Sequence, residues 1–455
     1  MVDLNNIQRI YFLGIGGIGM SALARYFARH GKTVSGYDKT PTALTHELHS
    51  EGMHITYEDS LETLDKSADL VIYTPAIPKN LEQLNYYQQS GIPLVKRAQV
   101  LGWITNSKFS ICIAGSHGKT STSSITTHLL KTANKDVAAF LGGISINLES
   151  NFTDGNTYAI AEADEYDRSF LNLEPDIALI TSVDTDHLDI YGNLEAIESS
   201  FHEFTKKIKK EGVLISQIHV NEKVLNKEVK NIRYALEDVQ ADFYARNIEV
   251  KNGAYHFDVV HSGGMISHVV SHYGGKHNVE NTVGAIAIAK QLGITDDEIR
   301  VGVASFKGVK RRFETHVQSS RIIYIDDYAH HPRELDAALN AARELYPGKK
   351  ITAIFQPHLF TRTRDLCDEF AAALSKADTV ILLDIYPARE LPVEGVTSKM
   401  IFDKISIVDK ILCTKDELVN VLSSRNNWEV VLTLGAGDID TKISEIKMLM
   451  EDLSI

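Results

Sequence analysis

Cysteine is scarce in this chain, which has three among 455 residues, at Cys112, Cys367 and Cys413. Three scattered cysteines are too few for a disulfide framework or a zinc cluster. Long apolar runs are also missing, since none approaches the roughly 20 residues that a membrane-spanning helix needs. The first ten residues, MVDLNNIQRI, lack the basic-then-apolar pattern of a signal peptide. We therefore expect a cytoplasmic protein without a membrane partner.

Positive charge is not in excess either. The chain has 47 lysines and arginines against 60 aspartates and glutamates, a formal net charge of −13. General nucleic-acid binding usually needs a basic face, so nucleic acid is not an expected partner. Apolar residues make up 44% and charged residues 24% of the chain, which is ordinary for a globular protein. The length is sufficient for two to four domains.

A glycine-rich stretch after an apolar run is the most informative part of the sequence. The run Phe109–Ala114 is typical of a buried strand, and residues 115–122 then read GSHGKTST. In phosphate-binding loops of this layout, backbone N–H groups point at phosphate oxygens, Lys119 adds a positive charge and the Thr120 hydroxyl can hold Mg²⁺. The common form of the motif has a further glycine where this chain has Ile113. A plain glycine turn is the structural alternative, which the adjacent strand and Gly-Lys-Thr sequence disfavour.

A second glycine motif lies near the N-terminus. Residues 11–20 read YFLGIGGIGM, with glycines at Gly14, Gly16, Gly17 and Gly19. The next apolar run ends before Asp38, at the spacing where an acidic residue contacts a ribose. This loop alone suggests a nicotinamide-dependent dehydrogenase. Such loops recognise diphosphate, however, so a nucleotide sugar would fit equally well. A tight structural turn without a ligand is the third interpretation. The phosphate loop downstream disfavours the dehydrogenase, because hydride transfer needs no ATP chemistry.

Carboxylates and a histidine follow two further predicted strands. Tyr158–Ala161 leads into Glu162, Asp164 and Glu165, and Ile177–Thr181 leads into Asp186 and His187. Ligand-contacting groups collect at the carboxyl ends of parallel strands, so these side chains are expected near the bound phosphates. Oxygen-rich sites with an occasional histidine suit Mg²⁺. Structural roles for single members of this set are the alternative.

Short apolar runs alternate with helix-length segments along the whole chain, which predicts an α/β protein with mostly parallel sheets flanked by helices. The expected strands are Ile10–Leu13, Thr33–Gly36, Leu70–Tyr73 and Pro93–Val95, then Phe109–Ala114, Tyr158–Ala161, Ile177–Thr181 and Val213–Ile215, then Ile322–Ile325, Thr352–Phe355, Thr379–Leu383, Lys410–Leu412 and Val430–Leu434. The basic segment Ser305–Phe313 is interpreted as an interdomain linker. Three domains are predicted, at residues 1–105, 106–309 and 310–455.

Together these motifs resemble the Mur ligase family, ATP-dependent enzymes that join amino acids to carboxylates. The resemblance covers nearly the whole chain and rests on GIGGIGMS (14–21), GSHGKTST (115–122), EADE (162–165), DHLDIYG (186–192), HNVEN (277–281), KRRFE (310–314), DDYAHHP (326–332) and FQPHLFTRTRD (355–365). It implies a Rossmann-like domain for a UDP-sugar, a P-loop ATPase-like domain and a Rossmann-like domain that closes over both. The last two blocks resemble the alanine-adding branch and its recycling relative.

The resemblance implies a reaction and its partners. ATP and Mg²⁺ are expected, with Mn²⁺ as a substitute metal, and the small-molecule substrates are UDP-N-acetylmuramate and L-alanine. The lactyl carboxylate would attack the γ-phosphorus to give an acyl phosphate, from which the alanine amine would displace phosphate. Lys119 and Mg²⁺ would neutralise charge as a carboxylate approaches the triphosphate. The family implies a role in peptidoglycan precursor synthesis, as a monomer or homodimer.

The resemblance also assigns residues to each substrate. ATP is assigned to Gly115, Ser116, His117, Gly118, Lys119, Thr120, Ser121, His277, Asn278, Asn281, Arg312 and Asp327. The UDP-sugar is assigned to Gly14, Gly16, Gly17, Ile18, Gly19, Asp38 and His187, and the amino acid to Tyr328, His330, His358 and Arg362. The metal is assigned to Thr120, Glu162 and His187, and catalysis to Lys119, Glu162 and His187. Helix capping or packing by His330 or His331, and solvated positions for Arg362 and Arg364, are the structural alternatives.

Two positions depart from the family pattern. Leu359 follows His358 where the alanine-adding enzymes often have a basic residue, so contact with the amino-acid carboxylate is assigned to Arg362. Several family members carry a carbamylated lysine downstream of the DH histidine. Ungapped counting places His202 there, so no carbamylated lysine is expected.

Three alternatives come from other branches or classes. A recycling ligase would add a preformed tripeptide to the same UDP-sugar and would need a larger acceptor pocket. An NAD-dependent oxidoreductase would transfer hydride without ATP. A nucleotide-sensing module would bind ATP without turnover, but it leaves Glu162, His187 and residues 326–332 without a purpose.

Overall fold

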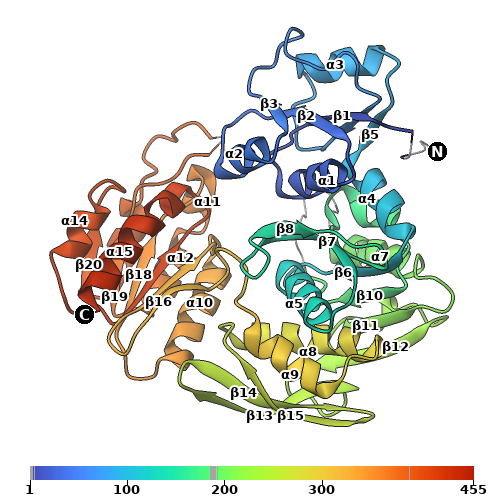
Figure 1. Cartoon of the computed structure of the whole chain (residues 1–455). Helices are drawn as coiled ribbons and strands as arrows, with labels where there is room; N and C mark the ends of the chain where they lie inside the picture. The colour runs from blue at the N-terminus through green and yellow to red at the C-terminus, as the bar shows by residue number, and fades with distance from the viewer. Residues whose placement is uncertain (1–3, 5, 185–190, 192, 389, 455) are drawn as a thin grey trace. The chain divides into compact units, whose positions relative to one another are not determined.

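The structure is a computed structural model that describes residues 4, 6–184, 191, 193–388 and 390–454. The chain divides into two compact units, one with residues 1–246, 258–269 and 280–306, the other with residues 247–257, 270–279 and 307–455. Three sheets, mostly parallel and accompanied by helices, follow one another along the chain (Figure 1) and confirm the predicted α/β class. None of the described helices combines the length and apolar character needed to cross a membrane.

The first sheet is a five-stranded parallel sheet in the order β3-β2-β1-β4-β5. Its elements are β1 (Arg9–Leu13), α1 (Ile18–Arg29), β2 (Thr33–Tyr37), α2 (Ala43–Ser50), β3 (His54–Thr56), β4 (Leu70–Tyr73), α3 (Glu82–Gln89), β5 (Leu94–Lys96) and α4 (Arg97–Asn106). The central strand β1 is RIYFL, buried at four of its five positions. Strand order reverses beside β1, which is where ligands bind in open α/β sheets. The glycine motif directly follows β1 and therefore lies at the position in this sheet where a ligand is expected to bind.

The second sheet has ten strands in the order β15-β14-β13-β12-β11-β10-β6-β9-β7-β8. Its strands are β6 (Phe109–Ala114), β7 (Val137–Ser145), β8 (Ser150–Thr153), β9 (Tyr158–Ala163), β10 (Ile177–Ile180), β11 (Val213–Gln217), β12 (Lys230–Ala235), β13 (Phe243–Lys251), β14 (Ala254–His261) and β15 (Gly264–Ser271). The helices are α5 (Lys119–Thr132), η1 (Tyr166–Asn172), α7 (Leu194–Thr205), η2 (Glu222–Val224), α8 (Lys276–Gln291) and α9 (Asp296–Ser305). Parallel β9 and β10 flank β6, so the segments that follow all three strands meet at one edge.

The third sheet has the order β16-β17-β21-β18-β19-β20 and only its edge strand β16 is antiparallel. Its strands are β16 (Glu314–Gln318), β17 (Ile323–Asp327), β18 (Ile351–Phe355), β19 (Thr379–Leu382), β20 (Lys410–Leu412) and β21 (Val430–Leu434). Its helices are α10 (Pro332–Leu345), α11 (Phe360–Asp365), α12 (Cys367–Leu374), α13 (Lys399–Lys404), α14 (Leu418–Ser423), η3 (Asp438–Lys442) and α15 (Ile443–Leu453). The loops after β17, β21, β18 and β19 share one edge of the sheet.

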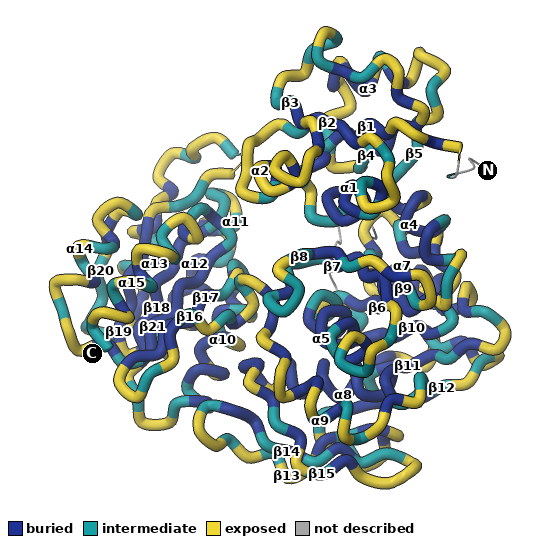
Figure 2. The backbone as a smooth tube through the Cα atoms, in the orientation of Figure 1, coloured by how far each residue is buried: buried dark blue, intermediate teal, exposed yellow. Residues whose placement is uncertain are grey.

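Buried residues are concentrated in the strands and on the inner faces of the helices (Figure 2). The three cysteines are free and buried, so they pack as small apolar side chains. Several strands were not predicted, namely β3, β7, β8, β12 to β16. Most of these are short or half-buried, as in β13, whose nine residues include only two buried ones. Such strands give no continuous apolar run for a sequence pattern to detect.

Candidate active site

The phosphate-binding loop joins β6 to α5. Gly115 and Gly118 have left-handed backbones, with φ of 137° and 81°, which side-chain-bearing residues adopt only under strain. A β-carbon at Gly118 would lie 2.6 Å from Oδ1 of Asn281 in α8, so the loop packs closely against that helix. No described side chain caps the start of α5. Its first N–H groups are the kind that bind phosphate in loops of this layout.

Lys119 lies at the first position of α5 and its ammonium group has protein partners. Nζ donates to both carboxylate oxygens of Glu165, at 2.8 and 2.9 Å, and to the carbonyl of Gly115 at 2.5 Å. The Glu165 side chain is only 3% exposed and that of Lys119 is 17% exposed, so little water screens this ion pair. Glu165 belongs to the EADE motif, and its ion pair with Lys119 was not predicted.

Thr120 and Glu162, the predicted metal ligands, lie together. The hydroxyl of Thr120 donates to Glu162 Oε2 at 3.1 Å, while Oε1 accepts from the Ser123 hydroxyl at 3.0 Å and the Gly142 N–H at 2.6 Å. Burial raises the pKa of the Glu162 carboxyl, against the opposing effect of these hydrogen bonds and of Lys119. A hydroxyl beside a half-buried carboxylate is an oxygen donor set that suits Mg²⁺. Ser121 follows in the same helical turn and is buried.

The segment after β10 returns to the phosphate loop. The hydroxyl of Ser116 accepts from the N–H of Asp184 at 2.9 Å, and His117 Nε2 lies 3.9 Å from an Asp184 carboxylate oxygen. These contacts place the beginning of the DTDHLD segment beside the loop. Asp186 and His187 lie outside the described residues, so the metal and sugar roles of His187 remain predictions.

Helix α8 carries three residues predicted to bind ATP. Asn281 lies against Gly118, as described above. Asn278 is buried and its Nδ2 donates to the carbonyl of Gly274 at 2.7 Å. Desolvation and the nearby Arg312 guanidinium lower the pKa of His277, and its contact with ATP remains a prediction.

The glycine motif of the first sheet leads into α1. Gly14 has a φ of 86°, and the N–H of Gly16 donates to Asp38 Oδ2 at 2.8 Å. Asp38 therefore bonds to the loop itself, and its predicted ribose contact remains a prediction. Gly17 is the N-cap of α1, which begins at Ile18, and none of the side chains that the structure describes caps that end. The N–H groups of the first turn, including that of Gly19, are therefore available to an anion.

The predicted amino-acid residues gather at the carboxyl edge of the third sheet. Ring centroids are 5.3 Å apart for Tyr328 and His330, and 6.0 Å apart for His330 and His358. His358 also stacks on Tyr386, at 5.8 Å and an interplanar angle of 22°. Tyr386 follows β19 and was not predicted. The four rings come from the ends of β17, β18 and β19, so they form one aromatic wall.

Arg362 and Leu359 lie on the segment that follows β18. Among the described residues, no hydrogen-bond partner is found for the buried Nη1 atom of Arg362, which is consistent with binding an anion. Leu359 has a φ of 71°, unusual for a residue with a side chain, and is the N-cap of α11. Its N–H donates to the carbonyl of Tyr386 at 3.0 Å. The residue that departs from the family pattern thus connects α11 to the aromatic wall.

Two adjacent arginines begin the third sheet and differ in their contacts. Arg311 bonds through Nε to the fully buried Asp326 at 3.0 Å and through Nη2 to the Gly435 carbonyl at 2.5 Å. Its guanidinium lies 5.2 Å from the Tyr328 ring centre, whereas that of the predicted Arg312 lies 6.0 Å from it. Arg311, which was not predicted, therefore joins the loops after β17 and β21 and supports the aromatic wall.

Replacing Arg311 by alanine should lower the free energy of unfolding by about 3–5 kcal/mol, because Asp326 would keep a buried charge without its cation. Denaturant titration measures this loss. Lys399→Ala is the matched control, because Lys399 and Asp403 form an exposed pair at 2.7 Å, and such pairs contribute about 1 kcal/mol or less. Equal stability of the two variants would show that Arg311 is not needed to offset the charge of Asp326.

Asp327, predicted to reach ATP, holds the turn after β17. Its carboxylate accepts from the N–H groups of Phe313 at 2.7 Å and Ala329 at 2.8 Å. Burial raises the pKa of Asp327 from 3.8 to about 6, against the opposing effect of these bonds and of Arg312. Any ATP contact of Asp327 remains a prediction.

The raised pKa of Asp327 predicts a pH dependence of stability. The folded protein holds this proton more tightly than the unfolded chain does. The contribution of the protonated Asp327 to the free energy of unfolding is therefore complete below pH 3.8 and is lost as the pH rises through about 6. The difference in unfolding free energy between the wild type and Asp327→Asn should shift by about 3 kcal/mol between these limits. Denaturant titrations from pH 3.5 to 7 measure it, and a constant difference would contradict the raised pKa.

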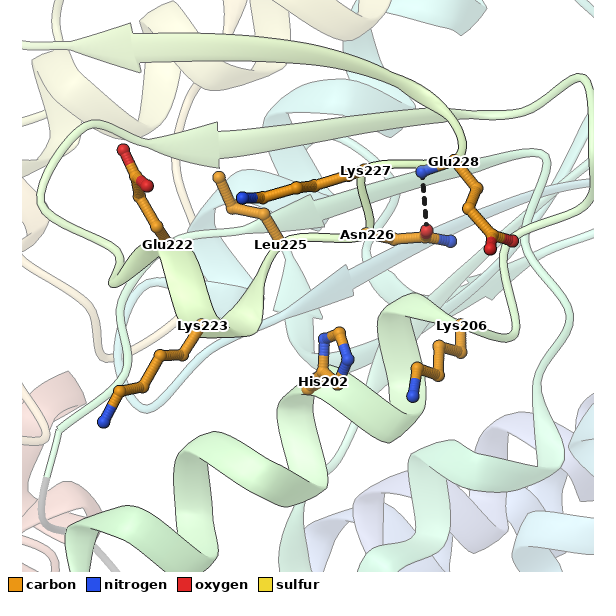
Figure 3. A pocket seen from close by; sticks show the side chains of 8 residues that line it. All are labelled: His202, Lys206, Glu222, Lys223, Leu225, Asn226, Lys227 and Glu228. Carbon is orange, nitrogen blue, oxygen red and sulfur yellow. Dashed lines mark hydrogen bonds between the residues drawn. The ribbon is translucent and has the colours of Figure 1, made fainter.

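His202, which ungapped counting places where some family members have a carbamylated lysine, lines a different cavity (Figure 3). This cavity of about 710 Å³ lies between α7 and the loop around η2 and is lined by His202, Lys206, Glu222, Lys223, Leu225, Asn226, Lys227 and Glu228. Its lining includes none of the predicted site residues. Nδ1 of His202 lies 3.4 Å from the Val224 carbonyl. We assign no metal to His202.

The fold and the site define an ATP-using enzyme built from a parallel sheet with a glycine loop, a sheet with a phosphate loop and a third α/β sheet. Family models for the Mur ligase catalytic, middle and glutamate ligase domains match residues 9–109, 113–289 and 311–437. The chain belongs to the Mur ligase family.

Full-length relatives indicate one branch of the Mur ligase family. The chain is 48% identical to UDP-N-acetylmuramate–L-alanine ligase of Parabacteroides distasonis, over 99% of this chain and 98% of that protein. It is 45% identical to the enzyme of the same name from Flavobacterium johnsoniae, over 99% of this chain and all of that protein.

Solved structures agree with this fold. The crystal structure of UDP-N-acetylmuramate-alanine ligase from Thermotoga maritima matches with a TM-score of 0.84 at 27% identity, covering 98% of this chain and all of that one. A murein peptide ligase from Psychrobacter arcticus matches with a TM-score of 0.69 at 22% identity, covering 97% of this chain and 98% of that one. The second match shows a shared fold alone.

Proposed function

We propose that this chain is an ATP-dependent ligase that joins L-alanine to the lactyl carboxylate of UDP-N-acetylmuramate in peptidoglycan precursor synthesis. The observation that carries the chemistry is the phosphate loop, in which Thr120 lies 3.1 Å from the strand-end carboxylate of Glu162. The full-length relatives, which bear the name of this activity, support the choice of sugar and amino acid.

The reaction would proceed in two steps. The lactyl carboxylate attacks the γ-phosphorus of ATP, ADP leaves and an acyl phosphate forms. The amine of L-alanine then attacks the acyl carbon, an amide bond forms and phosphate leaves. The ammonium of Lys119 would exchange Glu165 for the β- and γ-phosphates and offset the charge that develops on them.

Mg²⁺ fits the oxygen donors of the site, and Mn²⁺ would be a substitute. Thr120 and Glu162 would hold the metal, together with His187. When bound, the metal neutralises charge on the triphosphate and the attacking carboxylate. Glu162 is already oriented by Ser123 and Gly142, so the protein fixes this ligand before any metal arrives.

The three substrates would draw on residues of all three sheets. The first sheet offers the glycine loop and Asp38 to the UDP-sugar, and the second offers its phosphate loop and α8 to ATP. The third sheet offers Arg312 and Asp327 to ATP, and the aromatic wall with Arg362 to the amino acid. Arg362 suits the carboxylate of L-alanine because its guanidinium can form two parallel hydrogen bonds to it.

Two competing functions are separated by their substrates. The recycling ligase would use a preformed tripeptide as the acceptor, and only a fold-level likeness to a murein peptide ligase favours it. The first glycine loop was the feature that suggested an NAD-dependent oxidoreductase. In a Mur ligase the same loop would bind the UDP-sugar, so it no longer favours the oxidoreductase. A cytoplasmic monomer or homodimer without membrane or nucleic-acid partners remains our expectation.

Phosphate release from ATP tests the proposal directly. The protein is incubated with ATP, Mg²⁺ and UDP-N-acetylmuramate, and with L-alanine, the tripeptide L-alanyl-γ-D-glutamyl-meso-diaminopimelate or no acceptor. We expect release that requires both the sugar and L-alanine. Release with the tripeptide alone would assign the recycling activity instead. If phosphate is released with neither acceptor, the protein would instead be interpreted as a nucleotide-binding module without turnover.

A further inference from the structure

The last glycine of the first loop makes room for an arginine. A β-carbon at Gly19 would lie 2.6 Å from Nη1 of Arg97 and 3.3 Å from its Cδ. Gly19 is the second residue of α1 and Arg97 is the first residue of α4. In dinucleotide-binding loops the corresponding glycine allows close packing of helix and strand. Here it leaves space for a guanidinium group at the helix N-terminus.

Two positive features therefore coincide at the start of α1. The first turn of the helix has N–H groups without intrahelical acceptors, and its N-cap Gly17 supplies no side-chain cap. The N–H of the neighbouring Gly16 is already bonded to Asp38, so the donors of the first turn are the ones that face a ligand. The Arg97 side chain is only 20% exposed, and its charge is less screened than that of a surface arginine.

Among the residues that the structure describes, the anionic partner found for Arg97 is a weak one. Nη2 of Arg97 lies 3.4 Å from Asp164 Oδ2, whereas strong charge-assisted bonds are about 2.7–2.9 Å long. Asp164 is 39% exposed on its side chain, and its other oxygen accepts from the N–H of Tyr166. A phosphate oxygen could replace Asp164 at Arg97 without leaving Asp164 buried and without a partner.

We propose that Arg97 binds the diphosphate of the UDP-sugar, exchanging Asp164 for phosphate oxygens that also face the first turn of α1. The inference rests on the proposed function, which supplies the UDP-sugar. The lactyl carboxylate is the competing anion, because Arg97, Asp164 and Glu162 line one small cleft. The position of the guanidinium against Gly19 favours the diphosphate.

Calorimetric titration tests the assignment with two ligands. UDP-N-acetylmuramate has both the diphosphate and the lactyl carboxylate, whereas UDP-N-acetylglucosamine has the diphosphate alone. Arg97→Gln should weaken both by the same factor, about 10- to 100-fold, the loss of one or two charge-assisted hydrogen bonds. A loss confined to UDP-N-acetylmuramate would assign Arg97 to the lactyl carboxylate and overturn the proposal, as would unchanged affinity for both.

Three further variants separate binding from structure. Gly19→Ala keeps the charge but displaces the guanidinium, so it should also weaken both ligands. Asp164→Asn removes the competing anion and should bind both UDP-sugars at least as tightly as the wild type does. Weaker binding would mean that Arg97 has a structural role in its ion pair with Asp164 and does not bind the ligand. Arg9→Gln, which breaks the 2.8 Å pair with Asp65 in the same sheet, should bind as the wild type does. Failure of the wild type to bind UDP-N-acetylmuramate would overturn the proposed function itself.

Discussion

Replacing Lys119 by alanine should lower kcat for alanine addition by about 1000-fold or more. The γ-phosphoryl group gains charge as the lactyl carboxylate attacks, and a fixed cation in a water-poor site is among the largest contributions to such a step. Lys119 begins a helix whose N-terminus would also face the phosphates, so its removal leaves the backbone dipoles and the metal to offset the charge there. Phosphate release in the presence of the sugar and L-alanine measures the loss.

The ion pair of Lys119 with Glu165 adds a stability effect that must be separated from catalysis. The Glu165 side chain is 3% exposed and would lose its cation in Lys119→Ala. Breaking a buried pair on one side costs about 3–5 kcal/mol, so the single variant should unfold at lower denaturant concentration.

The double variant Lys119→Ala/Glu165→Gln isolates the catalytic role. Neutralising Glu165 should restore most of the lost stability, because the carboxylate charge that the Lys119 ammonium offset is then absent, while turnover stays as low as in the single variant. Recovery of turnover together with stability would show that the single variant fails through misfolding. Near-normal turnover in a folded Lys119→Ala protein would contradict the assignment of the phosphate loop.

The parts of the site that follow strand ends could be predicted from the sequence. The strand before Gly115 and the strand before Glu162 read as apolar runs, and parallel neighbours bring their carboxyl ends to one edge. The structure accordingly places Thr120 and Glu162 in hydrogen-bond contact. The same rule applied to the strand before Tyr386 would have indicated that residue as well.

Other parts depend on contacts that no sequence pattern encodes. The KRRFE block offers two adjacent arginines, and the φ of 59° at Arg311 helps determine which one turns toward Asp326. Arg97 belongs to no motif, and its approach to Gly19 results from the packing of α4 on α1. Half-buried strands such as β13 were missed for a related reason, because their exposed positions break the apolar run.

Replacing Glu162 by alanine should raise the Mg²⁺ concentration needed for half-maximal turnover by about 100-fold or more. Loss of a group that merely orients a metal ligand costs about 10- to 100-fold in metal affinity, and a direct ligand should cost at least the upper value. Glu162 is the half-buried carboxylate that Thr120 contacts, so its loss would also leave the Thr120 hydroxyl without that acceptor. Initial rates titrated with Mg²⁺ at saturating ATP measure the shift.

Ser123→Ala is the matched control for Glu162. It removes one hydrogen bond to the same carboxylate, 3.0 Å long, and leaves the carboxylate in place with its contacts to Thr120 and Gly142. Its metal requirement should therefore rise by only a few-fold, since a single neutral-donor hydrogen bond contributes about 1 kcal/mol. An equal shift in the two variants would mean that Glu162 acts through the local hydrogen-bond network. A metal titration of Glu162→Ala that matches the wild type would exclude Glu162 as a ligand and move the metal to the carboxylates beyond it in the EADE segment.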